Sequence, residues 1–114
     1  MSDRRSRPHG VVVVRGRSML PGLREGDRLL VRYGVPPAAG DVVVARFRDG
    51  TVVVKRAAER RRTASDGPGW WLLSDNADEG VADSRARGVV PDADVLAVAR
   101  WRLWPRPGRL RRLV

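Results

Sequence analysis

The sequence predicts an all-β domain, built as a small coiled sheet or partly open barrel. About six or seven short apolar runs, rich in Val, recur at near-regular spacing, with Gly, Asp and Pro between them. No segment has the 3.6-residue apolar period of an amphipathic helix. Several runs are apolar at consecutive positions, which is typical of strands buried on both faces. The 114 residues, 42% of them hydrophobic, suit one small domain with its own core.

The first half of the chain contains four of the predicted strands. Val11–Val14 is a run of four β-branched residues, which disfavours a helix and predicts a buried strand. Two similar segments follow at 26–33 and 40–47, and each starts with Gly-Asp and ends with Arg and an aromatic residue. Asp49-Gly50 is typical of a tight hairpin turn, so the second segment is expected to pair with a strand at 51–56.

The second half alternates between polar segments and strands. Residues 59–69 are expected to form a polar loop, and Trp70–Leu73 a short strand. Residues 75–87 are polar, acidic and without clear periodicity. Residues 94–104 form the last predicted strand. Its alternation is expected to place five apolar side chains on one face, namely Val95, Ala97, Ala99, Trp101 and Leu103.

The predicted organisation is a flexible basic arm at 1–9, a folded domain at 10–105 and a basic tail at 106–114. No segment reaches the ~18 to 20 apolar residues of a membrane span. The apolar run at 11–14 is shorter than the ~7 to 15 residues of a signal peptide core. We therefore expect no transmembrane anchor and a cytoplasmic location, whereas the sequence predicts no particular oligomeric state.

Composition excludes several kinds of site. The chain carries 23 Lys and Arg against 13 Asp and Glu, a net charge of +10. It has no Cys, which excludes disulfides, thiol catalysis and cysteine-ligated zinc. His9 is the only histidine, which excludes a two-His metal site and argues against a Ser-His-Asp hydrolase. We expect no metal and no cofactor, so an enzyme of this composition must move protons with Lys, Asp, Glu or Tyr.

Lys55 is the only lysine among the 23 basic residues. Arg cannot release its proton near neutral pH, so a single Lys in such a chain suggests a group that must deprotonate. Lys55 should share a strand face with Val53, with Arg56 pointing the other way. As a general base its pKa must fall from about 10.4 to ~7 to 8, which desolvation by apolar neighbours can achieve. The alternative is a strand-end Lys with its amine in solvent.

Ser18 follows the first predicted strand, in a turn that contains Gly16 and Pro21. A nucleophilic serine needs an exposed hydroxyl, a fixed backbone and amides directed at the developing oxyanion. A strand end that runs into a Gly- and Pro-containing turn provides these features. An ordinary capping or turn serine is the alternative interpretation.

A third polar cluster lies between 74 and 88. Asp75 and Asn76 can hold a turn through side-chain to backbone hydrogen bonds. Asp83 and Arg85 are two residues apart on what we expect to be a locally extended chain, where they can pair and brace a loop. An acidic surface loop without a further role is the alternative.

Taken together, these segments resemble the Ser-Lys peptidases of the signal peptidase I and LexA-type clan. The resemblance covers roughly residues 10–104, and five blocks match in order: SMLPGL at 18–23, GD at 26–27, VKR at 54–56, SDN at 74–76 and DSR at 83–85. Within the clan the sequence is most similar to the maturation proteases of nickel-type superoxide dismutase. The stretches that carry this similarity are GDRLLVRYG, GDVVVARF, VVVKRA, WWLLSDN and ADSRARG.

The resemblance implies a serine endopeptidase with Ser18 as nucleophile and Lys55 as general base. It implies that further residues support the oxyanion turn (Gly16, Arg17, Met19 and Pro21), brace the site (Asp75, Asn76, Asp83, Ser84 and Arg85) and pair with an extended substrate (Val12, Val13, Val14, Val53 and Val54). The implied partner is the precursor of a nickel superoxide dismutase. Removal of its N-terminal propeptide exposes a new N-terminus that binds nickel, so the metal belongs to the substrate.

Three positions depart from the pattern of that family. Ser74 stands where Gly is usual, which would matter if the backbone there were left-handed. Val81 stands where many signal peptidases have a Ser near the catalytic Lys. Gly16 replaces a Ser that lines the oxyanion hole in some members, which leaves the Ser18 amide as the main expected donor.

The sequence leaves three alternatives open. A LexA-type protein would cleave itself, but only a short stretch without an Ala-Gly pair precedes Ser18. A non-enzymatic basic β-barrel could bind nucleic acid through its charge of +10 and its Arg runs. The four Trp residues fall in predicted strands, where core packing explains them, so we expect no stable nucleic-acid partner. Contact of the Arg-rich ends with an anionic membrane surface is a minor alternative.

Overall fold

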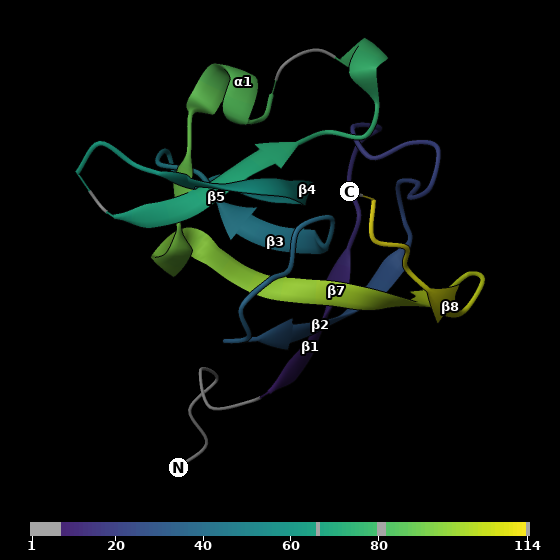
Figure 1. Cartoon of the computed structure of the whole chain (residues 1–114). Coiled ribbons are helices and arrows are strands. Elements are labelled where there is room, and N and C mark those ends of the chain that lie inside the picture. The colour runs from purple at the N-terminus through teal and green to yellow at the C-terminus, as the bar shows by residue number, and fades with distance from the viewer. Residues whose placement is uncertain (1–7, 66, 80–81, 114) are drawn as a thin grey trace.

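The computed structural model describes residues 8–65, 67–79 and 82–113. They form one antiparallel sheet of eight strands in the order β1-β2-β7-β3-β4-β5-β6, with β8 beside β7 (Figure 1). The predicted all-β class is confirmed. The strands are β1 His9–Val13, β2 Arg28–Tyr33, β3 Val42–Arg46, β4 Val52–Arg62, β5 Pro68–Leu73, β6 Val90–Pro91, β7 Val95–Trp104 and β8 Gly108–Arg109. Short helical turns are η2 Ala77–Glu79, α1 Ser84–Arg87 and η3 Asp92–Asp94.

The two similar Gly-Asp segments form the same local structure twice. Gly26 and Gly40 have φ values of +93° and +92°, a left-handed conformation that Gly adopts without strain. The carboxylates of Asp27 and Asp41 each accept a backbone N–H from three residues earlier, at 3.0 and 2.9 Å. Each turn therefore leads directly into a strand of the core: β2, which is buried at Leu29 and Val31, or β3, which is buried from Val42 to Ala45. The expected hairpin at Asp49-Gly50 joins β3 to β4.

The prediction of a polar loop at 59–69 is wrong at both ends. The strand β4 continues to Arg62, and β5 begins at Pro68 and pairs with it. The guanidinium groups of Arg60 and Arg61 lie over the rings of Trp70 and Trp71, at 5.1 and 3.9 Å from the ring centroids. These cation–π contacts cover the tryptophans, so a strongly basic sequence is stable here as a strand.

The first strand is half-exposed, contrary to the prediction of full burial. β1 lies at the edge of the sheet and pairs only with β2 among the described residues. Val11 and Val13 are 55% and 43% exposed, whereas Val12 packs against the core and Val14 is buried. Alternation therefore divides this run of valines between two environments.

The last strand does not keep its apolar residues on one face. Ala97 and Ala99 belong to one core cluster, whereas Val95 packs against the other. Trp101 and Leu103 are 43% and 37% exposed. The register of β7 shifts against both β2 and β3, and such bulges turn successive side chains away from simple alternation.

Two hydrophobic clusters hold the sheet together. β3 is shared between them: Val42 and Val44 lie in the first, Val43 and Ala45 in the second, so this strand is buried on both faces. The first cluster also contains Met19 and Leu23, from the segment that joins β1 to β2. The segment that carries Ser18 is therefore anchored in the core on the side of β1, β2 and β7.

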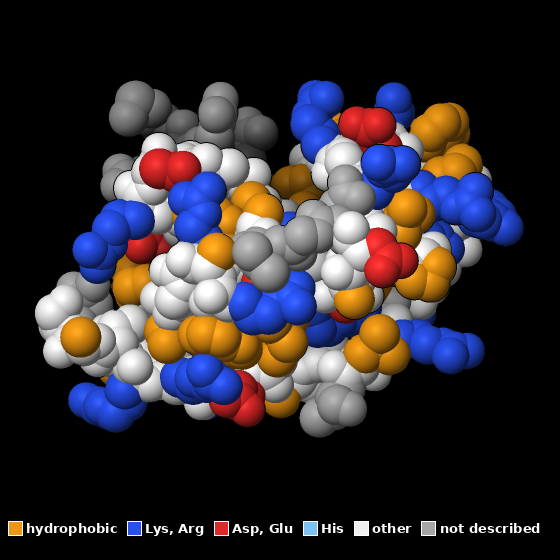
Figure 2. Space-filling view, turned by 90° about the horizontal axis from the view of Figure 1, so that it is seen from above, with side chains coloured by type: hydrophobic (Ala, Val, Ile, Leu, Met, Phe, Trp, Pro, Cys, Tyr) orange, Lys and Arg blue, Asp and Glu red, His pale blue; other side chains and the backbone are white. Residues whose placement is uncertain are grey.

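Residues 108–113, from the predicted basic tail, lie against the sheet. The backbone N–H of Leu113 donates to the Gly40 carbonyl at 3.1 Å, and Arg112 Nε donates to Asp41 at 2.7 Å. A Cβ on Gly40 would lie 2.9 Å from the Leu113 carbonyl oxygen, so this close approach requires glycine. The positive charge is widely spread: Lys and Arg side chains surround the hydrophobic ones on the upper face (Figure 2).

Within the described ranges, no helix has the length and apolar character that crossing a bilayer requires.

Candidate active site

The segment 14–27 places Ser18 at the surface on a fixed backbone. Its base is closed by two hydrogen bonds between Val14 and residues 26 and 27, at 2.8 and 2.9 Å. Inside it, the N–H of Leu23 donates to the Met19 carbonyl at 3.0 Å. Met19 is 1% exposed and Leu23 is 3% exposed, whereas Ser18 is partly exposed. The buried side chains of Met19 and Leu23 therefore fix this segment in the core, while the Ser18 hydroxyl stays accessible.

Asn76 holds the backbone on either side of the Ser18 amide. Its N–H donates to the Ser18 carbonyl at 2.9 Å, and its side-chain amide donates to the Arg17 carbonyl at 3.0 Å. Its side-chain oxygen accepts the N–H of Asp78 at 3.1 Å, which closes a local turn. The sequence predicted that local turn, but no sequence signal indicated the contacts to residues 17 and 18.

Lys55 lies directly against Ser18. Its Nζ is 2.9 Å from the Ser18 Oγ, although the two residues are 37 positions apart, and Lys55 is only 3% exposed. Burial lowers the pKa of Lys55, and the carboxylate of Asp83 opposes this by raising it. The structure therefore brings the two predicted catalytic residues into hydrogen-bond contact, in surroundings that favour the neutral amine.

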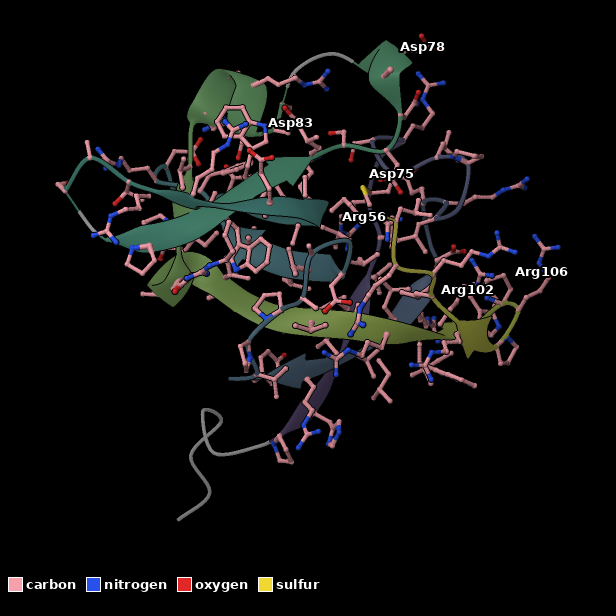
Figure 3. The ribbon with its side chains drawn as sticks, in the orientation of Figure 1. Arg56, Asp75, Asp78, Asp83, Arg102 and Arg106 are labelled. Carbon is pink, nitrogen blue, oxygen red and sulfur yellow. The ribbon has the colours of Figure 1, made fainter. Side chains whose placement is uncertain are left out.

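Arg56 points to the opposite side of β4, as alternation predicted. Its guanidinium forms two bonds to the Asp75 carboxylate, at 3.1 and 2.5 Å, and the two side chains face one another in Figure 3. It also donates to the carbonyls of Gly40 and Arg111, at 3.0 and 2.7 Å. Asp75 thus binds Arg56, whereas we expected it to hold its own turn. This pair fixes the chain immediately before Asn76.

Asp83 is fully buried and organises the chain after β5. Its carboxylate accepts the N–H of Ser74 at 2.8 Å and the N–H and guanidinium of Arg85 at 2.9 to 3.1 Å. Burial alone would raise its pKa, but these hydrogen bonds outweigh burial and the pKa of Asp83 is lowered. The pairing with Arg85 agrees with the prediction, but the extended chain does not, because Arg85 lies in the helical turn α1 that Asp83 caps.

Ser84 is a structural serine in this arrangement. It is 1% exposed, and its Oγ accepts the backbone N–H of Leu72 at 2.8 Å. Leu72 is itself fully buried. Ser84 therefore links α1 to β5, and it does not line the hollow that contains Ser18.

The departures from the family pattern have different outcomes. No described residue other than Gly has a positive φ, so Ser74 needs no glycine-like conformation. Gly16 has a φ of +74°, and its N–H donates to the Glu25 carboxylate at 3.2 Å. A serine at position 16 would be strained in this conformation. Val81 lies outside the described residues.

Ser18 and Lys55 lie in a hollow of about 320 Å³. One side is the outer edge of β1, and the other is β4 at Val52–Lys55, where the described pairing with β5 has not yet begun. All five valines predicted to pair with a substrate line this hollow, together with Arg15, Met19, Val44 and Val52. Larger hollows lie beside Phe47 and Trp70, but neither contains Ser18 or Lys55.

In the described part of the chain, no three His, Cys, Asp or Glu residues come close enough together to hold a metal ion. The donor atoms of the site are a hydroxyl, an amine and backbone amides, which suit acyl transfer to a serine.

One family model matches this chain, and it describes Peptidase S24-like proteins. The match extends over residues 2–98, which includes Ser18, Lys55 and the segment 74–85. The chain belongs to the Peptidase S24-like family. This places it among serine peptidases of the LexA and signal peptidase clan. No curated protein matches the chain significantly.

Proposed function

We propose that this Peptidase S24-like protein is a serine endopeptidase with a Ser18–Lys55 dyad. The observation that carries the proposal is the 2.9 Å contact between Lys55 Nζ and Ser18 Oγ. An amine is an effective base only when it is neutral, and burial of Lys55 shifts its protonation in that direction. The neighbouring Met19 is buried, and the backbone carbonyl of Ser18 accepts the N–H of Asn76. The backbone that carries the Ser18 hydroxyl is therefore fixed.

The reaction follows from these two groups. Neutral Lys55 accepts the proton of Ser18 while Oγ forms a bond to the scissile carbonyl carbon. The resulting ammonium donates that proton to the leaving nitrogen as the C–N bond breaks, which leaves an ester on Ser18. Lys55 then takes a proton from water as the water oxygen attacks the ester, and returns it to Oγ when the acid product leaves. Backbone amides of the turn, that of Ser18 first, stabilise the two oxyanions.

The two strand edges define how a substrate binds. An extended peptide between the edges of β1 and β4 can form backbone hydrogen bonds with both, which is binding by strand addition. The hollow is lined mainly by valine side chains, so it suits small aliphatic residues next to the scissile bond. Such a site requires an unfolded segment of a protein substrate.

We infer that the substrate is the precursor of a nickel superoxide dismutase. The similarity of five stretches to the maturation proteases of that enzyme supports this choice. Nickel is bound by the processed substrate, because ligands from its new N-terminus appear only after cleavage. Cleavage therefore has to occur at one defined bond.

The test combines cleavage and product analysis. The purified protein is mixed with a nickel superoxide dismutase precursor, and product N-termini are read by mass spectrometry. Ser18→Ala removes the nucleophile, and Lys55→Arg retains a positive charge but cannot deprotonate. We expect one cleaved bond with the wild type and a loss of about 10²-fold or more in both variants. Equal cleavage by wild type and variants contradicts the dyad.

Self-cleavage is the second candidate, because the Peptidase S24-like match includes LexA-type chemistry. Incubation of the protein alone distinguishes it from cleavage of a precursor. A Ser18-dependent break in the chain itself, with the precursor intact, would support self-cleavage. Binding of nucleic acid that falls steeply with salt and is unchanged in Ser18→Ala would instead support the basic β-barrel alternative.

A further inference from the structure

The strands β1, β2 and β7 form one end of the sheet, and one face of this part carries exposed apolar and basic side chains. The register places Val11, Leu30 and Trp101 side by side, and places Val13, Arg28 and Trp104 in the next row. Directly paired residues of antiparallel strands share a face, so these six side chains form one surface. We call this surface the outer face.

The outer face exposes side chains that usually need a partner. Trp101 and Trp104 are 43% and 53% exposed, and Val11 and Val13 are 55% and 43% exposed. Both cores of the protein lie elsewhere, and none of these four side chains belongs to them. Trp and Arg are the residues that most often dominate binding energy in protein interfaces.

The charge of the outer face is uniformly positive. Arg28 lies over the ring of Trp104, with its guanidinium carbon 5.1 Å from the ring centroid. Arg109 on β8 pairs in register with Trp101 and is exposed. No acidic residue occurs among the six side chains of the face. A complementary partner therefore presents apolar side chains with Asp or Glu around them.

The outer face is continuous with the catalytic hollow through β1. Val12, Val13 and Val14 line the hollow, and Val11 and Val13 are the exposed valines of the outer face, so Val13 belongs to both. A substrate strand that pairs with the free edge of β1 alternates in the same way, so every second side chain lies beside Val11 and Val13. The substrate thus meets the outer face without leaving the edge that guides it to Ser18.

We propose that the outer face is an exosite, a second surface that binds the body of the protein substrate through an acidic and apolar patch. This inference rests on the proposed peptidase function and adds how the substrate is selected. Nucleic acid is a poorer fit, because valine and leucine offer no stacking surface and Arg28 already covers Trp104. A lipid surface is the competing occupant, and the experiment separates it.

The test compares two substrates for the same catalytic site. One is the full-length nickel superoxide dismutase precursor, and the other is a short peptide that spans its cleaved bond. We expect the double variant Trp101→Ala/Trp104→Ala, and separately Arg28→Glu, to lower kcat/KM for the precursor about tenfold or more, mainly through KM. Cleavage of the peptide should stay within about twofold of wild type, which also shows that the variants fold. Arg62→Glu on β4 is the matched control for the charge change.

A binding measurement keeps the exosite separate from the peptidase proposal. Ser18→Ala protein, which cannot cleave, should bind the precursor, and the two Trp substitutions should weaken that binding about tenfold. Equal losses on precursor and peptide, or no loss of precursor binding, would overturn the exosite. Loss of binding to vesicles of phosphatidylglycerol and phosphatidylcholine, with precursor cleavage unchanged, would overturn it in favour of a membrane contact. Failure of the wild type to cleave either substrate, with binding intact, rejects the peptidase and leaves the docking surface standing.

Discussion

Replacement of Ser84 by alanine tests whether the Asp-Ser-Arg block is structural. The Ser84 hydroxyl accepts the N–H of Leu72 at 2.8 Å, and the two residues are 1% and 0% exposed. Alanine removes the acceptor and leaves that N–H buried, where water cannot replace the lost bond. Among the hydrogen bonds of the described residues, Ser84 makes none to Ser18 or Lys55, and it does not line their hollow.

The size of the effect follows from the burial of both partners. A buried donor left without an acceptor costs about 1 to 3 kcal/mol of folding free energy. For a domain of this size, each kcal/mol lowers Tm by about 4 °C. We therefore expect Ser84→Ala to lower Tm by about 4 to 12 °C.

The assay is thermal unfolding followed by circular dichroism, with peptide cleavage measured at a temperature where both proteins are folded. Ser65→Ala, which removes an exposed hydroxyl in the β4–β5 connection, is the matched control and should change stability by less than about 0.5 kcal/mol. The Ser84 variant should cleave the peptide at nearly the wild-type rate. An unchanged Tm, or lost cleavage in a fully folded variant, would refute the structural assignment.

Three further outcomes follow from the same structure. Because burial lowers the pKa of Lys55, kcat/KM for the peptide should rise with pH through an apparent pKa below that of an ordinary lysine, and activity should fall as pH drops below it. Asp83→Asn removes the charge that raises the pKa of Lys55, so the midpoint of the pH profile should move to lower pH; an upward shift would contradict this. Gly69→Ala should destabilise the β5–β6 pair by about 1 to 3 kcal/mol in denaturant titrations, because its Cβ would lie 2.3 Å from the Val90 carbonyl oxygen. Gly108→Ala, with open space around its Cβ, should be close to neutral, and equal effects would exclude the steric explanation.

Local sequence signals predicted the strands and one hairpin because those signals act over a few residues. Runs of β-branched residues predicted β1, β3 and the start of β4, the apolar segment after Gly26-Asp27 predicted β2, and Asp49-Gly50 predicted the turn. The sequence did not indicate that Arg60 and Arg61 lie in a strand, because their guanidinium groups pack on Trp70 and Trp71, which belong to the neighbouring strand β5. The bulges of β7 depend on two neighbouring strands at once, so alternation within one segment could not reveal them.

Local chemistry made Ser18 and Lys55 candidates, and the order of motifs indicated that they act together. Ser18 and Lys55 are 37 residues apart, and only the resemblance indicated that they meet. The contacts of Asn76 with residues 17 and 18 and of Arg56 with Arg111 span 55 or more positions along the chain. Backbone carbonyls accept most of these bonds, and a carbonyl is present at every position, so side-chain identity gives no signal for them.

Because Lys55 is the only lysine, chemical modification of lysine side chains acts on the candidate active site alone. The 114 residues contain one ε-amine, that of Lys55, and it lies in the hollow beside Ser18. An amine-directed acylating reagent reacts only with the unprotonated form, so its rate at Lys55 reports access to the hollow and the charge state there in one measurement. Peptide mapping separates the Lys55 adduct from that of the N-terminal α-amine, which the same reagent also acylates, and so counts competent sites. A substrate segment lying between β1 and β4 would protect that amine from the reagent.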